Sequence, residues 1–142
     1  MSVAEVCRFS GTPYRRSRTL PAVLVIENDR ELRIRLTEQL TEIGVMPMVA
    51  RNGYEGVRMA GAMRPGLVVI DGLLPEMHGF EVARFIRALD PNYRPHIAMI
   101  TAISKHTRYH NEAKLKYGID DYVMKPVSAK ALAAVVWKVT KD

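Results

Sequence analysis

Short apolar runs alternate with longer segments of helical periodicity from Ala22 to the end of the chain. The apolar or β-branched runs cover residues 22–26, 46–50, 67–70, 96–100 and 119–124, and glycine, proline or charged residues flank them. Runs of this length and composition are typical of strands that are buried on both faces. The pattern therefore predicts five strands that alternate with helices.

Three segments between or after these runs carry apolar residues at helical spacing. The sets are Leu32, Leu36, Leu40 and Ile43; Val82, Phe85, Ile86 and Leu89; and Leu132, Val135, Val136 and Val139. Two further helices are predicted over residues 53–63 and 105–116, where glycines or polar residues dilute the pattern. Asn28, three residues before Glu31, and Ser128 indicate where two of the helices begin.

Alternation of strands and helices predicts an α/β fold with a parallel sheet, because each parallel connection needs a crossover. The simplest arrangement is a doubly wound five-stranded parallel sheet of order 2-1-3-4-5, a flavodoxin-like fold. In such sheets ligands bind beyond the carboxyl ends of the strands, where the strand order reverses. The residues that end the strands are therefore the first candidates for a functional site.

Length and composition fit one domain over residues 22–142, preceded by a flexible basic extension over residues 1–21. That extension holds four arginines against one glutamate, within a net charge of +6 for the 142 residues. No apolar run approaches the roughly 20 residues of a membrane span. With a single cysteine, Cys7, and no secretory signal, we expect a cytoplasmic protein without membrane contact.

The predicted strand ends bring together residues that suit phosphoryl chemistry. Glu27 and Asn28 follow the first strand, Asp71 the third, Thr101 the fourth and Lys125 the fifth. A carboxylate such as Asp71 can act as the nucleophile that accepts a phosphoryl group. Oxygen ligands can hold Mg²⁺ beside it, while a lysine and a hydroxyl meet the phosphate oxygens.

Four stretches resemble, in order, the motifs of response-regulator receiver domains, as in chemotaxis-type single-domain regulators of two-component signalling. They are VLVIENDRELR, LVVIDGLLPEMHGFEVARFIR, MITA and DYVMKP. The resemblance implies that Asp71 is the phosphate acceptor and that Lys125 contacts the phosphate. It further implies that Thr101 is the switch hydroxyl and Tyr122 the switch aromatic.

The resemblance also implies a metal site and a backbone feature beside the acceptor. The Mg²⁺ ligands would be Glu27, Asn28, Asp71 and the backbone carbonyl of Leu73. A cis peptide is implied before Pro126, since X-Pro bonds tolerate that form.

A receiver domain over residues 22–142 would take phosphate from a sensor histidine kinase or a histidine phosphotransfer protein. It would signal to a downstream protein or a like receiver through the surface of residues 105–116, the fifth strand and the last helix. Such a domain is a phosphoacceptor switch rather than an enzyme, with at most self-phosphorylation and self-dephosphorylation chemistry. Because nothing follows the last helix, we expect a stand-alone receiver without a DNA-binding domain.

Asn28 departs from the pattern, because receivers usually carry aspartate at the second acidic position. The Asn28 carbonyl can still coordinate a cation, but one negative charge is missing, so weaker Mg²⁺ binding is expected. This departure leaves an alternative open. The chain would then be a degenerate pseudo-receiver that acts as a phosphorylation-independent scaffold for protein interaction.

Overall fold

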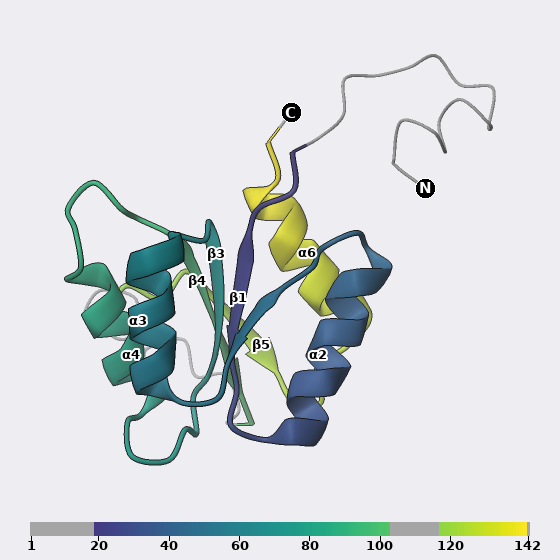
Figure 1. The fold of residues 1–142 in the computed structure, drawn as a ribbon. Coiled ribbons are helices and arrows are strands. Elements are labelled where there is room, and N and C mark those ends of the chain that lie inside the picture. The colour runs from purple at the N-terminus through teal and green to yellow at the C-terminus, as the bar shows by residue number, and fades with distance from the viewer. Residues whose placement is uncertain (1–18, 103–116, 142) are drawn as a thin grey trace.

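The computed structural model describes residues 19–102 and 117–141, and in them five parallel strands form one sheet of order β2-β1-β3-β4-β5 (Figure 1). The strands are β1 (Val23–Ile26), β2 (Met48–Ala50), β3 (Leu67–Asp71), β4 (His96–Thr101) and β5 (Asp121–Met124). The strand order reverses between β1 and β3, as in a doubly wound sheet. The predicted fold class and strand order are confirmed.

Helices cover both faces of the sheet. They are α2 (Arg30–Glu42), α3 (Gly53–Met63), α4 (Gly79–Arg87) and α6 (Ala129–Val139). The α2 and α6 helices pack together on one face, and α3 and α4 on the other (Figure 1). The helix predicted over residues 105–116 lies outside the described residues.

Side-chain caps fix where three of the helices begin. The α2 helix is capped by Asp29, whose side chain accepts a hydrogen bond from the Glu31 amide, so the prediction that Asn28 caps this helix is wrong by one residue. Ser128 caps α6 as predicted, and Asn52 caps α3. Asp29 also places a negative charge at the positive end of the α2 dipole, which favours it over a neutral cap.

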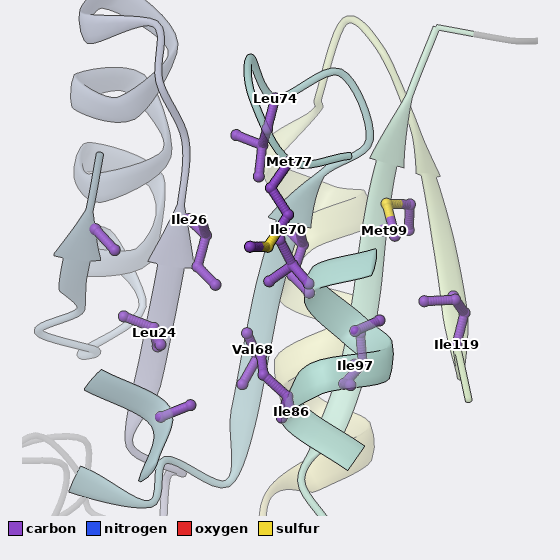
Figure 2. Packing of buried hydrophobic residues seen from close by; sticks show 14 of the residues in the cluster. Leu24, Ile26, Val68, Ile70, Leu74, Met77, Ile86, Ile97, Met99 and Ile119 are labelled. Atoms are coloured by element: carbon purple, nitrogen blue, oxygen red, sulfur yellow. The ribbon is translucent and has the colours of Figure 1, made fainter. Parts of the chain in front are cut away.

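The sheet separates the core into two layers because successive strand residues point to opposite faces. On the α3 and α4 side, Leu24 and Ile26 of β1 and Val68 and Ile70 of β3 pack against the helices (Figure 2). On the α2 and α6 side, the alternate residues of the same strands pack against Leu36, Leu40, Leu132, Val135 and Val136. Both faces of β1 and β3 are thus buried, which explains their continuous apolar sequences.

The apolar set predicted on the third helix is only partly buried. Val82 and Ile86 are fully buried, whereas Phe85 is 46% and Leu89 40% exposed. The α4 helix ends at Arg87, so Leu89 lies beyond its last turn, and Phe85 lies at the margin of the packed face. Spacing alone predicts the helix but not the width of its buried stripe.

The described ends of the chain meet at the amino-terminal edge of the sheet. Thr19 and Lys141 form an antiparallel bridge, and Leu20 packs against the core layer next to α2 and α6. Residues 19–21 therefore pack on the domain, three residues ahead of the boundary that the sequence suggested. Within the described ranges, no helix is long and apolar enough to cross a membrane.

Candidate functional site

Two carboxylates and a lysine meet where β1, β3 and β5 end. Asp71 is the last residue of β3, Glu27 directly follows β1, and Lys125 directly follows β5. The Lys125 ammonium lies 3.1 Å from Asp71 Oδ2. Because parallel strands all end at the same edge of the sheet, residues far apart in sequence share this position, as the sequence predicts.

Glu27 and Asp71 are the buried charged residues of the described chain, at 1% and 4% exposure. Asp71 Oδ1 accepts a hydrogen bond from the Leu73 amide at 2.9 Å, and Oδ2 accepts one from Lys125. Glu27 Oε1 accepts from the Asp29 amide at 3.0 Å. Glu27 Oε2 is buried and receives no hydrogen bond from a donor group among residues 19–102 and 117–141; only when Glu27 is protonated can it form a hydrogen bond with Asp71.

The two carboxyl groups influence each other's protonation in opposite directions. Burial, followed by the hydrogen bond with Asp71, raises the pKa of Glu27 to about 8. Burial also acts to raise the pKa of Asp71, but hydrogen bonds from Glu27, the Leu73 amide and Lys125 outweigh it and lower that pKa. In the absence of a cation, the negative charge of the pair is therefore favoured on Asp71, as expected for two close carboxyl groups of which one has a cationic partner.

Two glycines shape the loop that follows Asp71, and sequence reasoning missed both. A Cβ atom on Gly79 would lie 2.6 Å from the Asp71 carbonyl oxygen, so only glycine lets α4 begin this close to the strand end. The Gly79 amide donates to the Gly72 carbonyl, and the Gly72 amide donates to the Ile100 carbonyl. The loop is therefore folded back onto the ends of β3 and β4.

Thr101 and Tyr122 lie on the neighbouring strands β4 and β5. The Thr101 carbonyl accepts a hydrogen bond from the Lys125 amide at 2.9 Å, which ties the end of β4 to the residue that contacts Asp71. Tyr122 is half-buried and packs against the core layer next to α3 and α4. The peptide bond between Lys125 and Pro126 is cis, as predicted.

Asn28 and Leu73 are both exposed at the rim of the site. The Arg33 guanidinium donates hydrogen bonds to the backbone carbonyls of Glu27 and Asn28, at 3.0 and 3.1 Å. This contact holds the turn after β1 in place. Arg33 was not anticipated, because its position within α2 carries no signal that the side chain reaches back to the preceding loop.

The donor set fits a hard divalent cation. Within the described residues no group of three histidine, cysteine or acidic side chains is placed to hold a metal. Mg²⁺, however, is commonly bound through one or two carboxylates with waters completing its shell. The Glu27 and Asp71 carboxylates supply that minimum, and the unpartnered Glu27 Oε2 is an oxygen that a cation would satisfy.

Residues 23–137 match the family described as "Response regulator receiver domain". The transcriptional regulatory protein AfsQ1 of Streptomyces coelicolor is 35% identical over 115 residues, which are 81% of this chain and 49% of that protein. The DNA-binding response regulator MtrA of Mycolicibacterium smegmatis is 36% identical over 114 residues, 80% of this chain and 48% of that protein. This chain thus spans about half the length of these curated relatives.

Solved structures agree with the observed fold. The receiver domain of the Francisella response regulator 1452 superposes with a TM-score of 0.74 at 27% identity, covering 84% of this chain and 95% of that one. The receiver domain of the sensor histidine kinase PA1611 from Pseudomonas aeruginosa PAO1 has a TM-score of 0.73 at 24% identity, covering 84% and 97%. The latter was solved with a magnesium ion coordinated in its active-site cleft.

Proposed function

The chain belongs to the response regulator receiver domain family, and on that premise we propose that Asp71 accepts a phosphoryl group from a phosphohistidine donor. Receiver domains are phosphoacceptor switches of two-component systems rather than classical enzymes, and they interact with histidine kinases or phosphotransfer proteins. The observation that carries the proposal is the 3.1 Å contact between Lys125 and the buried Asp71 carboxylate.

The transfer exchanges one bond to phosphorus for another. An Asp71 carboxylate oxygen attacks the phosphorus atom, the new P–O bond forms, and the P–N bond to the donor imidazole breaks with its electron pair leaving on nitrogen. The Lys125 ammonium neutralises charge on the phosphoryl oxygens. The lowered pKa of Asp71 keeps this nucleophile ionised at neutral pH.

Receiver domains use Mg²⁺, and this chain has groups to bind it. Glu27, Asp71, the Asn28 side-chain oxygen and the Leu73 backbone carbonyl would hold the ion. When bound, Mg²⁺ offsets the repulsion between an anionic nucleophile and an anionic phosphoryl group. Asn28 contributes no charge, so we expect Mg²⁺ to bind more weakly than in receivers with an aspartate there.

The conformational change that signals phosphorylation begins with the hydroxyl of Thr101. A phosphoryl group at Asp71 adds acceptor oxygens near the end of β4, and the Thr101 hydroxyl moves to donate to one of them. Tyr122 then rotates toward the space that Thr101 leaves. The surface that includes β5 and α6 changes with it and contacts a downstream protein or a like receiver.

The matched region is 49% of AfsQ1 and 48% of MtrA, and MtrA is a DNA-binding response regulator. The proposed function is accordingly that of the receiver itself, namely phosphoryl acceptance followed by contact with a protein partner.

A phosphorylation-independent scaffold is the second candidate. The exposed Asn28 at the usual second acidic position favours it, because a site with one carboxylate fewer binds Mg²⁺ less tightly. This candidate predicts that the fold and the partner surface persist while phosphodonors have no effect.

Intact mass spectrometry separates the two candidates. The protein is incubated with phosphoramidate and Mg²⁺, and an increase of one phosphoryl group is expected on the wild-type chain but not on Asp71→Asn. The matched control Asp90→Asn removes a half-buried carboxylate that pairs with Arg64 at the other end of the molecule, and it should keep the adduct. A wild-type protein that gains no mass under these conditions would support the scaffold.

A further inference from the structure

We propose that Arg33 is a positioning residue for the Mg²⁺ site and that it acts through the backbone of the turn between β1 and α2. That turn carries Glu27 and Asn28, two of the residues that would hold the ion. One guanidinium nitrogen of Arg33, Nη1, donates to the Glu27 carbonyl at 3.0 Å and to the Asn28 carbonyl at 3.1 Å. The Mg²⁺ site is part of the proposed function, so this role of Arg33 rests on it.

Two successive peptide groups are restrained because their carbonyl oxygens bond to the same nitrogen atom. A peptide group is planar, so a bond that holds its oxygen also holds the orientation of the whole plane. The planes on either side of Asn28 are both held in this way, which restrains the backbone torsions of that residue. The direction of its Cα–Cβ bond follows from those torsions. Arg33 therefore orients the Asn28 side chain, although its hydrogen bonds go to the main chain.

Asn28 depends on this restraint more than Glu27 does. Glu27 is buried, its amide donates to the Ala50 carbonyl at 3.0 Å, and its Oε1 accepts from the Asp29 amide. Asn28 is exposed, and in the part of the chain that the structure describes its side chain makes no hydrogen bond. A neutral amide attracts Mg²⁺ less strongly than a carboxylate does. Its contribution to binding therefore gains more when it is oriented before the ion arrives.

The surroundings of Arg33 suit a residue that positions the turn. Its backbone is fixed near the start of α2, where its amide donates to the carbonyl of the cap residue Asp29 at 2.9 Å. Its side chain is half-buried and, among the described residues, forms no ion pair with a carboxylate that would draw it elsewhere. A guanidinium stays charged and presents its donors in a rigid plane. Groups that orient metal ligands commonly contribute a factor of about ten or more to metal affinity.

The charge of Arg33 and its hydrogen bonds affect Mg²⁺ in opposite directions. A guanidinium repels a dication, so removal of the charge alone would tighten Mg²⁺ binding. Loss of the two hydrogen bonds would weaken Mg²⁺ binding, because the turn would no longer be held. Arg30 provides a charge-matched control, since it is exposed in the same helix and its side chain makes no hydrogen bond to any described residue. The difference between matched variants at the two positions reports the hydrogen bonds.

Mg²⁺ affinity is measured on the ¹⁵N-labelled full chain without a phosphodonor, from the shifts of the Asn28 side-chain amide and the Gly72 backbone amide. We expect the Kd of Arg33→Met to exceed that of Arg30→Met roughly threefold or more. Arg33→Lys keeps the charge on a stem one atom shorter, so it should lose at least one of the two bonds and bind Mg²⁺ more weakly than Arg30→Lys. Affinities in both Arg33 variants that equal or exceed those of their Arg30 counterparts would overturn the proposal.

A second measurement separates positioning from a general effect on the fold. Adduct formation from phosphoramidate is followed by intact mass while the Mg²⁺ concentration is raised, and the loss of rate in Arg33→Met should shrink toward saturation. A loss that is equal at every Mg²⁺ concentration would refute positioning. A wild type that binds Mg²⁺ but gains no adduct would refute the proposed function and leave the affinities to decide the role of Arg33. A wild type that binds no Mg²⁺ would refute the role of Arg33 itself.

Discussion

The two ends of the sheet both concentrate charged side chains, but they are organised differently. At the carboxyl end, Glu27 and Asp71 are buried with one cation, Lys125, and one carboxylate oxygen has no partner among the described residues. At the amino end, Asp120 and Asp121 are each paired with basic side chains. The carboxyl end thus has two acidic groups for one cation, whereas at the amino end each acidic group has a basic partner.

The amino-end network is centred on Arg87 at the end of α4. Its guanidinium donates to the carbonyls of Pro95 and Gly118 and to the Asp120 carboxylate at 2.8 Å. Asp121 accepts from Lys138 at 2.6 Å, and His96 Nε2 lies 2.5 Å from it. These contacts tie α4, β4, β5 and α6 together.

The contrast separates stability from function within one sheet. A buried pair of acids with an unpartnered oxygen costs free energy, and such a cost persists at sites that must bind a cation or a phosphoryl group. The amino-end network has no comparable deficit. We therefore expect substitutions at the amino end to lower stability, and those at the carboxyl end to raise it while removing function.

Arg87→Ala is expected to have the largest effect. It leaves the Asp120 carboxylate and two backbone carbonyls without their partner, and the free energy of unfolding should fall by about 3 kcal/mol. Urea denaturation at pH 7 measures the change. The control Arg84→Ala removes an exposed arginine from the same helix and should change stability by less than about 0.5 kcal/mol. Equal losses in the two variants would show that the Arg87 contacts contribute nothing specific.

The amino-end network also marks what the sequence could not predict. Strand order, the place of Asp71 at the end of β3 and its meeting with Lys125 followed from apolar runs and from the residues that end them. Arg87 gave no such signal, because its partners are mostly backbone carbonyls, which no sequence pattern identifies. The exposure of Phe85 depends likewise on where α4 lies, and the cap at Asp29 on the local turn rather than on residue type.

Glu27→Gln should have the next largest effect, in the opposite direction. The Glu27 pKa is about 8 in the folded protein against an ordinary value of 4.5, so the folded state holds this proton more tightly. The contribution of this proton to the free energy of unfolding is therefore complete below pH 4.5. It is lost progressively as the pH rises from there through 8. The neutral amide avoids that loss, and metal-free Glu27→Gln should be more stable than wild type by about 2 kcal/mol at pH 8.

At pH 4 the same substitution should have little effect, because Glu27 is then protonated in both states. Glu38→Gln, which alters an exposed carboxyl of α2, is the control and should behave like wild type at both pH values. Chelator is present throughout. A destabilised Glu27→Gln variant at pH 8 would show that this carboxylate is stabilising and would remove the contrast between the two ends.

Asn28→Asp sharpens the comparison by adding charge to the carboxyl end. A third carboxylate should tighten Mg²⁺ binding by about tenfold, which corresponds to about 1.4 kcal/mol. Isothermal titration calorimetry measures the affinity. Asp29→Asn is the matched control, since asparagine keeps the side-chain cap of α2 while it removes the charge. Loss of Mg²⁺ affinity in Asp29→Asn would instead show that Asp29 supplies the charge that Asn28 lacks.

Lys138→Met should have the smallest effect, although it also breaks a contact of the amino-end network. The Lys138 side chain is 57% exposed, and exposed ion pairs contribute only about 0.5 kcal/mol. Burial acts to raise the pKa of Asp121, but Lys138 and His96 outweigh it and lower that pKa. The contribution is therefore present at neutral pH, is lost as the pH falls through the lowered pKa, and should disappear in 1 M salt. A loss as large as that of Arg87→Ala would mean that the whole network acts as one unit, whereas a small and salt-sensitive loss assigns the strength of this end to the partly buried guanidinium.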